Sequence, residues 1–229
     1  MESDLEKYRK SKILVWIYKN IYRKIFPGLR RHLKNALSDC QSVLDLGCGK
    51  NSPIQYCNIP YSVGVEIFQP YLEESKKKKI HTKYIKKDIK KLSFKSNSFD
   101  AVIALDVLEH LRKEDGYELI ERMEIWARKK IIIFTPHGYT FQDDYNHNPF
   151  QIHKSGWQIE DLQKLGFKVF GMNGWKKLRK GYRSQMRYKP IIFWELASEL
   201  TQKIAYFCPR IAFQIFAIKE LKKEYANKK

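Results

Sequence analysis

Long apolar runs and paired cysteines are both missing from this sequence. No apolar run reaches the roughly 18 residues that a membrane-spanning helix needs, and no small-residue cleavage site follows an apolar stretch near the start. The four cysteines (Cys40, Cys48, Cys57 and Cys208) have neither a C-x-x-C spacing nor a disulfide-dense pattern. These absences argue against membrane spans, a secretory signal and a disulfide framework, and they predict a reduced, cytoplasmic setting.

Acidic residues are scarce as well, with 25 Asp and Glu against 44 Lys and Arg and a net charge of +19. A charge of this size favours an anionic partner, which could be RNA, the inner face of an acidic membrane or a phosphorylated acceptor. A generally solvated, lysine-rich surface explains the same composition more simply and is the favoured interpretation. Charge alone therefore leaves the partner open.

What the sequence does contain is a regular alternation of strand and helix patterns. Residues 1–39 are expected to form a basic helical extension, helical over 3–38 and broken at Pro27-Gly28. Residues 40–229 are expected to form one domain with two halves, 40–138 and 139–229. The first half holds short apolar runs at 43–47, 62–67, 83–88, 100–106 and 130–135, with helices at 70–79 and 115–128. This alternation predicts a doubly wound α/β fold, with a mostly parallel seven-stranded sheet and helices on both faces.

The second half is expected to begin with a helix over about 157–165, which Ser155 would cap with Gln158 three residues later. A strand at 167–172, a basic loop at 173–190 and a strand at 211–218 should follow. Between the last two, residues 191–207 predict one amphipathic helix with Ile192, Leu196, Leu200 and Ile204 on one stripe. That stripe could cover the edge of the sheet, which is the favoured interpretation, or face a membrane or an amphiphilic acceptor. The tail after 218 predicts polar helix or disorder.

The strongest motif is VLDLGCGKN at residues 43–51, where a buried strand runs into a glycine-containing loop. Gly47 and Gly49 permit a tight turn and a close approach of the backbone to a ligand. Asp45 would repel the pyrophosphate of a dinucleotide, and Asn51-Ser52 replaces the third glycine of the dinucleotide fingerprint. The motif therefore favours a cationic ligand without phosphate, such as S-adenosylmethionine.

Further acids follow at the ends of the next strands. Glu66 lies at the end of the second strand, where a carboxylate can accept both hydroxyls of a ribose. Asp88 ends the third strand, where its oxygen can accept the adenine amino proton while the Ile89 backbone faces the ring. Leu105-Asp106 end the fourth. Ligands bind beyond the carboxyl ends of such strands, so these residues should share one rim.

In order and spacing, these segments resemble the class I S-adenosylmethionine-dependent methyltransferases, and most of all the small, diverse branch often called type 11 or type 12. The resemblance covers roughly residues 40–170 and rests on DLGCG (45–49), GVEIF (64–68), KKDI (86–89) and FDAVIALDVLEHL (99–111). The short segment 50–61 departs from it, because it leaves little room for the usual first helix.

The resemblance implies the cofactor and its contacts. S-adenosylmethionine would be held at its methionine end by Asp45 and the loop Gly47-Cys48-Gly49, with Leu105 and Asp106 lining the pocket nearby. The ribose would lie at Glu66-Ile67 and the adenine at Asp88-Ile89. The resemblance also implies that residues 40–138 form the cofactor half of a methyltransferase domain and residues 139–229 its acceptor half.

The catalytic residues are less sharply indicated. His137 follows Thr135-Pro136 at the end of the fifth strand, and His153 lies in a polar loop, so either could face the acceptor, and His153 could be a base or a structural residue. Glu109-His110 could start a helix beneath the cofactor. The histidines show no ligand spacing with one another or with cysteines, so no metal site is predicted.

The acceptor must be inferred from a missing motif. Thr135-Pro136-His137-Gly138 stands where methylators of base and amide nitrogens carry an Asn/Asp-Pro-Pro-aromatic sequence. This favours an oxygen or carbon acceptor on a small or lipid-linked molecule. The alternatives are an RNA methyltransferase and a protein that binds the cofactor without chemistry; a NAD-dependent oxidoreductase is disfavoured by Asp45. The oligomeric state stays open.

Overall fold

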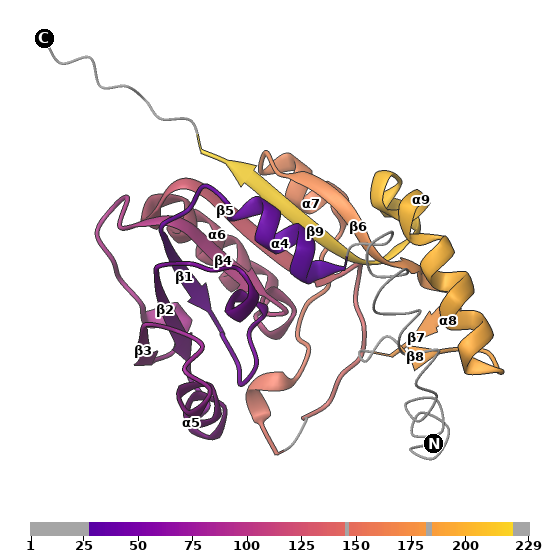
Figure 1. Ribbon diagram of the computed structural model, residues 1–229, viewed down its shortest axis with the longest axis horizontal. Helices are drawn as coiled ribbons and strands as arrows, with labels where there is room; N and C mark the ends of the chain where they lie inside the picture. The colour runs from indigo at the N-terminus through magenta and orange to yellow at the C-terminus, as the bar shows by residue number, and fades with distance from the viewer. Residues whose placement is uncertain (1–27, 145–146, 182–184, 222–229) are drawn as a thin grey trace, which may run out of the picture.

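In the computed structural model, seven strands form one twisted sheet with helices on both faces (Figure 1). The structure describes residues 28–144, 147–181 and 185–221, so the segments predicted over 3–27 and after 221 lie outside the described residues. The strand order is β3-β2-β1-β4-β5-β9-β6. Their bounds are β1 Ser42–Leu46, β2 Tyr61–Glu66, β3 Lys83–Lys86, β4 Phe99–Leu105, β5 Ala127–Pro136, β6 Lys168–Trp175 and β9 Ala212–Glu220.

Strands β1 to β5 pair in parallel, whereas β9 runs antiparallel to both of its neighbours, β5 and β6. Strand β4 is buried along nearly its whole length because helices cover both faces of the sheet, which is why its sequence is an unbroken apolar run. The predicted fold class is confirmed, and all five strands predicted in the first half are present.

The helices divide between the two faces. On one face, α6 (Lys113–Trp126) and α7 (Ile159–Lys164) pack on the sheet through Leu119, Met123 and Leu162. On the other, α4 (Leu29–Ala36) packs through Leu33, beside the short 3-10 helix at 53–56. Helix α5 (Gln69–Lys77) joins β2 to β3. The segment 50–61 indeed holds no more than one helical turn.

Three predictions for the second half need correction. Helix α7 is capped by Gln158 and Asp161 rather than by Ser155, whose hydroxyl instead donates to the Leu108 carbonyl. The segment 173–190 is not all loop, since β6 continues to Trp175 and a small hairpin follows, with β7 Arg179–Lys180 and β8 Gln185–Met186. The single helix expected over 191–207 is two helices, α8 Ile191–Leu200 and α9 Gln202–Phe207.

The helices α8 and α9 cover the sheet edge with one face and expose the other. Ser198, Gln202 and Ala205 are buried, and Gln202 bonds to the backbone of Gly171 and Gly174 in β6. The favoured interpretation, that the apolar stripe covers the sheet edge, is wrong, because Leu196, Leu200 and Ile204 are exposed, as are Phe193 and Phe207. The side chain of Ile192 lies outside the described part of the structure. The polar and small residues, rather than the apolar stripe, therefore dock these helices on the domain.

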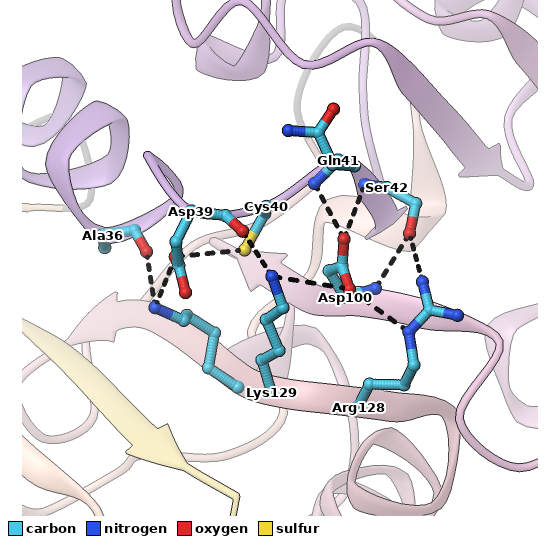
Figure 2. A network of polar contacts seen from close by, with 9 residues as sticks. Ala36, Asp39, Cys40, Gln41, Ser42, Asp100, Arg128 and Lys129 are labelled. Carbon is cyan, nitrogen blue, oxygen red and sulfur yellow. Dashed lines mark hydrogen bonds and ion pairs between the residues drawn. The ribbon is translucent and has the colours of Figure 1, made fainter.

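A polar network closes the amino-terminal end of the parallel strands (Figure 2). Asp100, at the start of β4, accepts hydrogen bonds from the backbone amides of Gln41 and Ser42 and pairs with Arg128 and Lys129 of β5. Nearby, Lys130 of β5 pairs with Asp39 at 2.8 Å. The chain entering β1 is thereby tied to its neighbours at the end of the sheet opposite the glycine loop.

Candidate cofactor and acceptor site

The glycine loop that follows β1 is held tightly in place. Gly47 has φ +63°, and a Cβ at this position would lie 2.7 Å from a Val107 methyl carbon, so any side chain would collide there. Gly49 has φ +56°, a conformation that side chains disfavour, and the Cys48 amide donates to the Val65 carbonyl of β2 at 2.9 Å. The loop therefore lies against β2 and against the residues that follow β4.

Glu66 fixes the loop from the end of β2. Its two carboxylate oxygens accept hydrogen bonds from the amides of Gly49 at 3.0 Å and Phe68 at 2.8 Å. The residue is buried, and burial raises its pKa although the amides of Phe68, Gly49 and Ile67 lower it. Each carboxylate oxygen has two lone pairs, so Glu66 keeps acceptor capacity for a ligand in the adjoining cavity.

Asp45 lies beneath the loop rather than in the cavity wall. It is only 1% exposed, accepts a 2.5 Å hydrogen bond from the Ser52 hydroxyl, and lies 3.4 Å from His81 Nε2. Burial raises the pKa of Asp45 to about 7 and lowers that of His81 to about 4, so His81 is neutral near pH 7. No pattern in the sequence predicted that His81, which lies between α5 and β3, would meet Asp45.

A cavity of about 220 Å³ opens beyond the carboxyl ends of β1, β2 and β4. Six of the predicted cofactor residues line it: Gly47, Glu66, Ile67, Asp88, Ile89 and Asp106. The lining also includes Lys90, Val107, His110, Leu111, Phe150, Gln151 and Lys154. Asp45, Cys48, Gly49 and Leu105 stand outside the lining and support it from behind or from the loop.

Asp106 is held in an uncommon backbone conformation where β4 ends. Its φ is +53°, its amide donates to the Phe134 carbonyl at 2.7 Å, and its carboxylate accepts from the Gln214 side chain at 3.1 Å. The enclosing protein raises its pKa to about 7, although the side chain is accessible from the cavity. Asp88 differs, because its carboxylate caps the next 3-10 helix by accepting from the Lys90 amide.

Two segments distant in sequence meet at one side of this cavity. The carbonyl of Glu109 accepts from the amides of Lys154 at 2.7 Å and Ser155 at 3.1 Å. These bonds bring His153 beside Glu109 and His110, and the two histidine rings lie 4.9 Å apart between centroids. One ligand-type atom from each of Glu109, His110 and His153 lies within 4.8 Å of the others.

Burial favours the neutral form of all three side chains. It raises the pKa of Glu109 well above the usual range, to which the charge of Asp106 adds, and it lowers the pKa of His110 to about 4. The pKa of His153 is also lowered by burial. Thr135 donates to the Glu109 carboxylate at 2.9 Å.

The two predicted catalytic histidines lie in different places. His153 belongs to the cluster beside the cavity. His137 lies at the end of β5, where its Nδ1 is 3.1 Å from the Ala212 carbonyl, and it lines neither the cavity nor the cluster. Gln151 and Lys154 were missed as cavity residues because they follow β5 by more than a dozen residues and carry no local motif.

The lining suits a ligand with hydroxyl groups and positive charge. Three carboxylates, from Glu66, Asp88 and Asp106, face one small space, and the glycine loop permits close approach of a ligand to the backbone. A pyrophosphate would be repelled by these acids. Fold and cavity together define a Rossmann-like α/β domain whose ligand lies at the carboxyl ends of the strands.

Comparisons with known proteins support the resemblance seen in the sequence. A model described as a methyltransferase domain matches residues 44–130. An uncharacterized protein of Methanocaldococcus jannaschii is 28% identical over 131 residues, which are 57% of this chain and 56% of the relative. The match thus spans little more than half the length of that relative.

The fold recurs in solved methyltransferases. A S-adenosylmethionine-dependent methyltransferase from Archaeoglobus fulgidus superposes with a TM-score of 0.52 at 21% identity, covering 89% of this chain and 100% of the other. One from Clostridium acetobutylicum gives 0.54 at 12% identity, covering 91% and 98%. The model match over residues 44–130 and the shared fold both support the resemblance to the class I S-adenosylmethionine-dependent methyltransferases.

These similarities support the predicted enzyme class and cofactor. Among the residues that the structure describes, no helix has the length and apolar character needed to cross a membrane.

Proposed function

We propose that this methyltransferase transfers the methyl group of S-adenosylmethionine to an oxygen or carbon atom of a small or lipid-linked acceptor. The observation that carries the proposal is the continuity of the cavity, which passes from the acids at the strand ends to Phe150, Gln151 and Lys154 in the acceptor half. One wall can hold the cofactor while the other receives the acceptor.

The cofactor side follows from the geometry of the rim. Glu66 has lone pairs left to accept the ribose hydroxyls, with Ile67 beside it, and Asp88 with Ile89 would hold the adenine. Gly47 and Asp106 would border the methionine end, supported by Cys48, Gly49 and Leu105. Asp45 would act through Ser52, by fixing the loop from below.

S-adenosylmethionine supplies a methyl group bonded to a positively charged sulfur, which is already a good leaving group. In the proposed transfer, the acceptor atom would bond to the methyl carbon, the electron pair of the carbon–sulfur bond would stay on sulfur, and the acceptor would lose a proton. The protein must align the two partners and exclude water. The imidazole of His153 lies beside His110 at the cavity wall, and burial favours its neutral form. We propose it as the general base that accepts that proton.

The lipid-linked part of the proposal rests on the exposed stripe of α8 and α9. Phe193, Leu200, Ile204 and Phe207 are 57%, 66%, 63% and 83% exposed, and a basic segment precedes them in the chain. An apolar stripe next to basic residues suits the surface of an anionic membrane or an amphiphilic molecule. Such a surface would bring a lipid-linked acceptor to the domain.

The acceptor can be found directly. Extracts of host lipids, glycans and RNA would be incubated with the protein and methyl-labelled cofactor, and the labelled product identified by mass spectrometry. Label on an oxygen or carbon of a small or lipid-linked molecule is expected. Label confined to RNA would support the RNA methyltransferase alternative, and cofactor binding without label in any fraction would support a non-catalytic role.

The surface is tested separately by sedimentation with anionic and neutral vesicles. The intact protein should prefer anionic vesicles, and Leu196→Asp and Leu200→Asp should each weaken this binding at least severalfold. Ile125→Asp, at a 52% exposed position on α6, is the matched control and should bind as the intact protein does. Absence of vesicle binding, together with RNA affinity that falls with salt at a log–log slope of about −0.7 per phosphate, would overturn this part of the proposal.

A further inference from the structure

In the described part of the chain, the side chains of Glu109, His110 and His153 form a cluster whose joint role the proposed methyl transfer does not explain. They come from two segments that backbone hydrogen bonds join, between the Glu109 carbonyl and the amides of Lys154 and Ser155. Their convergence is therefore built into the fold and does not depend on one flexible side chain. Glu109 and His153 are 3% and 6% exposed, and His110 reaches the cavity wall.

The hydrogen bonds of the two imidazoles determine which nitrogen is available. Nδ1 of His110 lies 3.3 Å from the Ile152 carbonyl, and Nδ1 of His153 contacts the Thr140 carbonyl. A carbonyl can only accept, so each Nδ1 carries the proton and each Nε2 keeps its lone pair. Metal-binding histidines are commonly oriented in this way, with the other ring nitrogen donating to a backbone carbonyl or carboxylate.

A bound cation would stabilise the charged form of the buried Glu109 carboxyl group, which burial disfavours. Glu109 is buried, its carboxylate accepts a hydrogen bond from Thr135, and Asp106 brings a second carboxyl group close to it. Within residues 28–144, 147–181 and 185–221, Glu109 forms no ion pair. Ionised carboxylates in protein interiors are usually paired with a cation or bound to a metal.

We propose that Glu109, His110 and His153 bind one divalent transition-metal ion at the wall of the cavity. Two imidazole nitrogens and one carboxylate suit zinc, cobalt, iron or manganese and leave coordination positions open. With metal–ligand bonds of about 2.0–2.2 Å, the donor atoms, now within 4.8 Å of one another, need to approach by only about 1 Å.

The role of the ion rests on the proposed methyl transfer, whereas its binding does not. A hydroxyl of the acceptor that reaches the open coordination positions would have its pKa lowered, and its proton would leave to solvent before the oxygen attacks the methyl carbon. The lone pair of His153 would then bind the metal ion, so His153 could no longer act as the general base. The site would thus select acceptors that offer an oxygen atom.

The test measures metal binding without cofactor or acceptor. Full-length protein, stripped with a chelator, would be titrated with Co²⁺ and followed by calorimetry and by visible absorption, with Zn²⁺ added in competition. One equivalent should bind with a spectrum free of thiolate charge-transfer bands. Glu109→Gln and His153→Asn should each weaken binding at least tenfold, while His147→Asn, at an exposed histidine a few residues away, should not.

Circular dichroism and cofactor affinity establish that each variant is folded. Failure of the intact protein to bind Co²⁺ or Zn²⁺ would overturn the inference, as would equal binding by folded His153→Asn. Neither result contradicts the proposed methyl transfer. If the metal-free protein still methylates its acceptor, His153 would again be the proposed base that accepts the acceptor's proton. Metal binding without any methylated product would instead count against the proposed function alone.

Discussion

The two ends of the sheet carry the same kind of residue in opposite electrostatic states. At the amino-terminal end, Asp39 has a lowered pKa through its hydrogen bond to Lys130. Burial alone would raise the pKa of Asp100, but the Gln41 amide and the charges of Lys129 and Arg128 hold it below its ordinary value (Figure 2). At the carboxyl end, Asp45, Glu66, Asp106 and Glu109 all have raised pKa values, with burial as the leading cause.

The difference separates stability from function within one sheet. Paired acids at the amino-terminal end stabilise the fold, because the folded state favours their charged form. Among the described residues, the acids at the carboxyl end have no positively charged partner. Their burial therefore lowers the stability of the folded protein. Functional sites often show this pattern, because a ligand later supplies the missing partner.

The largest expected effect is at Glu66. In Glu66→Ala, the ribose loses charge-assisted hydrogen bonds worth about 1.5–3 kcal/mol each, so the affinity for S-adenosylmethionine or its demethylated product should fall at least tenfold. Calorimetry measures the affinity, and Glu74→Ala, at a partly exposed acid on α5, is the control. Unchanged affinity would show that the carboxyl end of β2 does not hold the cofactor.

A second comparison concerns the pH dependence of stability. Because the pKa of Asp45 is about 7 in the folded protein and ordinarily 3.8, the folded state keeps a proton that the unfolded chain has released, and stability should fall as pH rises between these values. Asp45→Asn cannot ionise and retains an acceptor for Ser52. The gain in unfolding free energy that Asp45→Asn produces should be larger at pH 8 than at pH 4, by about 2–4 kcal/mol.

Urea unfolding at the two pH values measures this change, with Asp144→Asn at an exposed position as the control. A gain that is equal at both pH values would mean that Asp45 is charged in the folded state. The paired acids behave in the opposite way: their stabilisation is present above pH 3.8 and is lost as pH falls through their lowered pKa values.

Asp100 should matter for stability and not for the cofactor. Asp100→Ala leaves the Gln41 and Ser42 amides without their acceptor, so the unfolding free energy should fall by about 1–3 kcal/mol. Cofactor affinity, measured by calorimetry at a temperature where the variant is folded, should stay within a factor of two or so of the intact protein. A tenfold loss of affinity would show that the two ends are coupled.

The smallest effect is expected at Asp39. The residue is exposed, and in Asp39→Ala the ammonium of Lys130 keeps the Ala36 carbonyl and Glu220 as partners. Denaturant unfolding should therefore show a loss below about 1 kcal/mol, as is usual for exposed ion pairs. A loss as large as that of Asp100→Ala would show that the two acids act as one network.

Much of the fold could be predicted from sequence because its signals are local. Buried parallel strands are short apolar runs, and the acids at their ends mark where each strand stops, so β1 to β5 and the residues Glu66, Asp88 and Asp106 could be predicted. The helix cap at Ser155 was predicted wrongly for the same reason. Its local pattern fits a cap, yet its hydroxyl bonds to Leu108, 47 residues earlier.

The features that sequence did not reveal depend on contacts between distant segments. His81 meets Asp45 only because α5 returns the chain to β3, and His153 meets Glu109 only through backbone bonds across two loops. The periodicity of 191–207 predicted an apolar stripe, but the favoured interpretation that this stripe docks on the sheet edge was wrong. Gln202 and Ala205 decide this, because they fit closely against β6.

The position of β9 imposes an order on folding. This strand lies between β5 and β6, and it pairs Lys130 with Glu220, which lie 90 positions apart in the chain. During synthesis, β5 and β6 leave the ribosome with exposed edges that cannot pair with each other in the native arrangement. Until β9 inserts, those edges are open to pairing with other chains, so this step is where we expect slow folding and a need for chaperones.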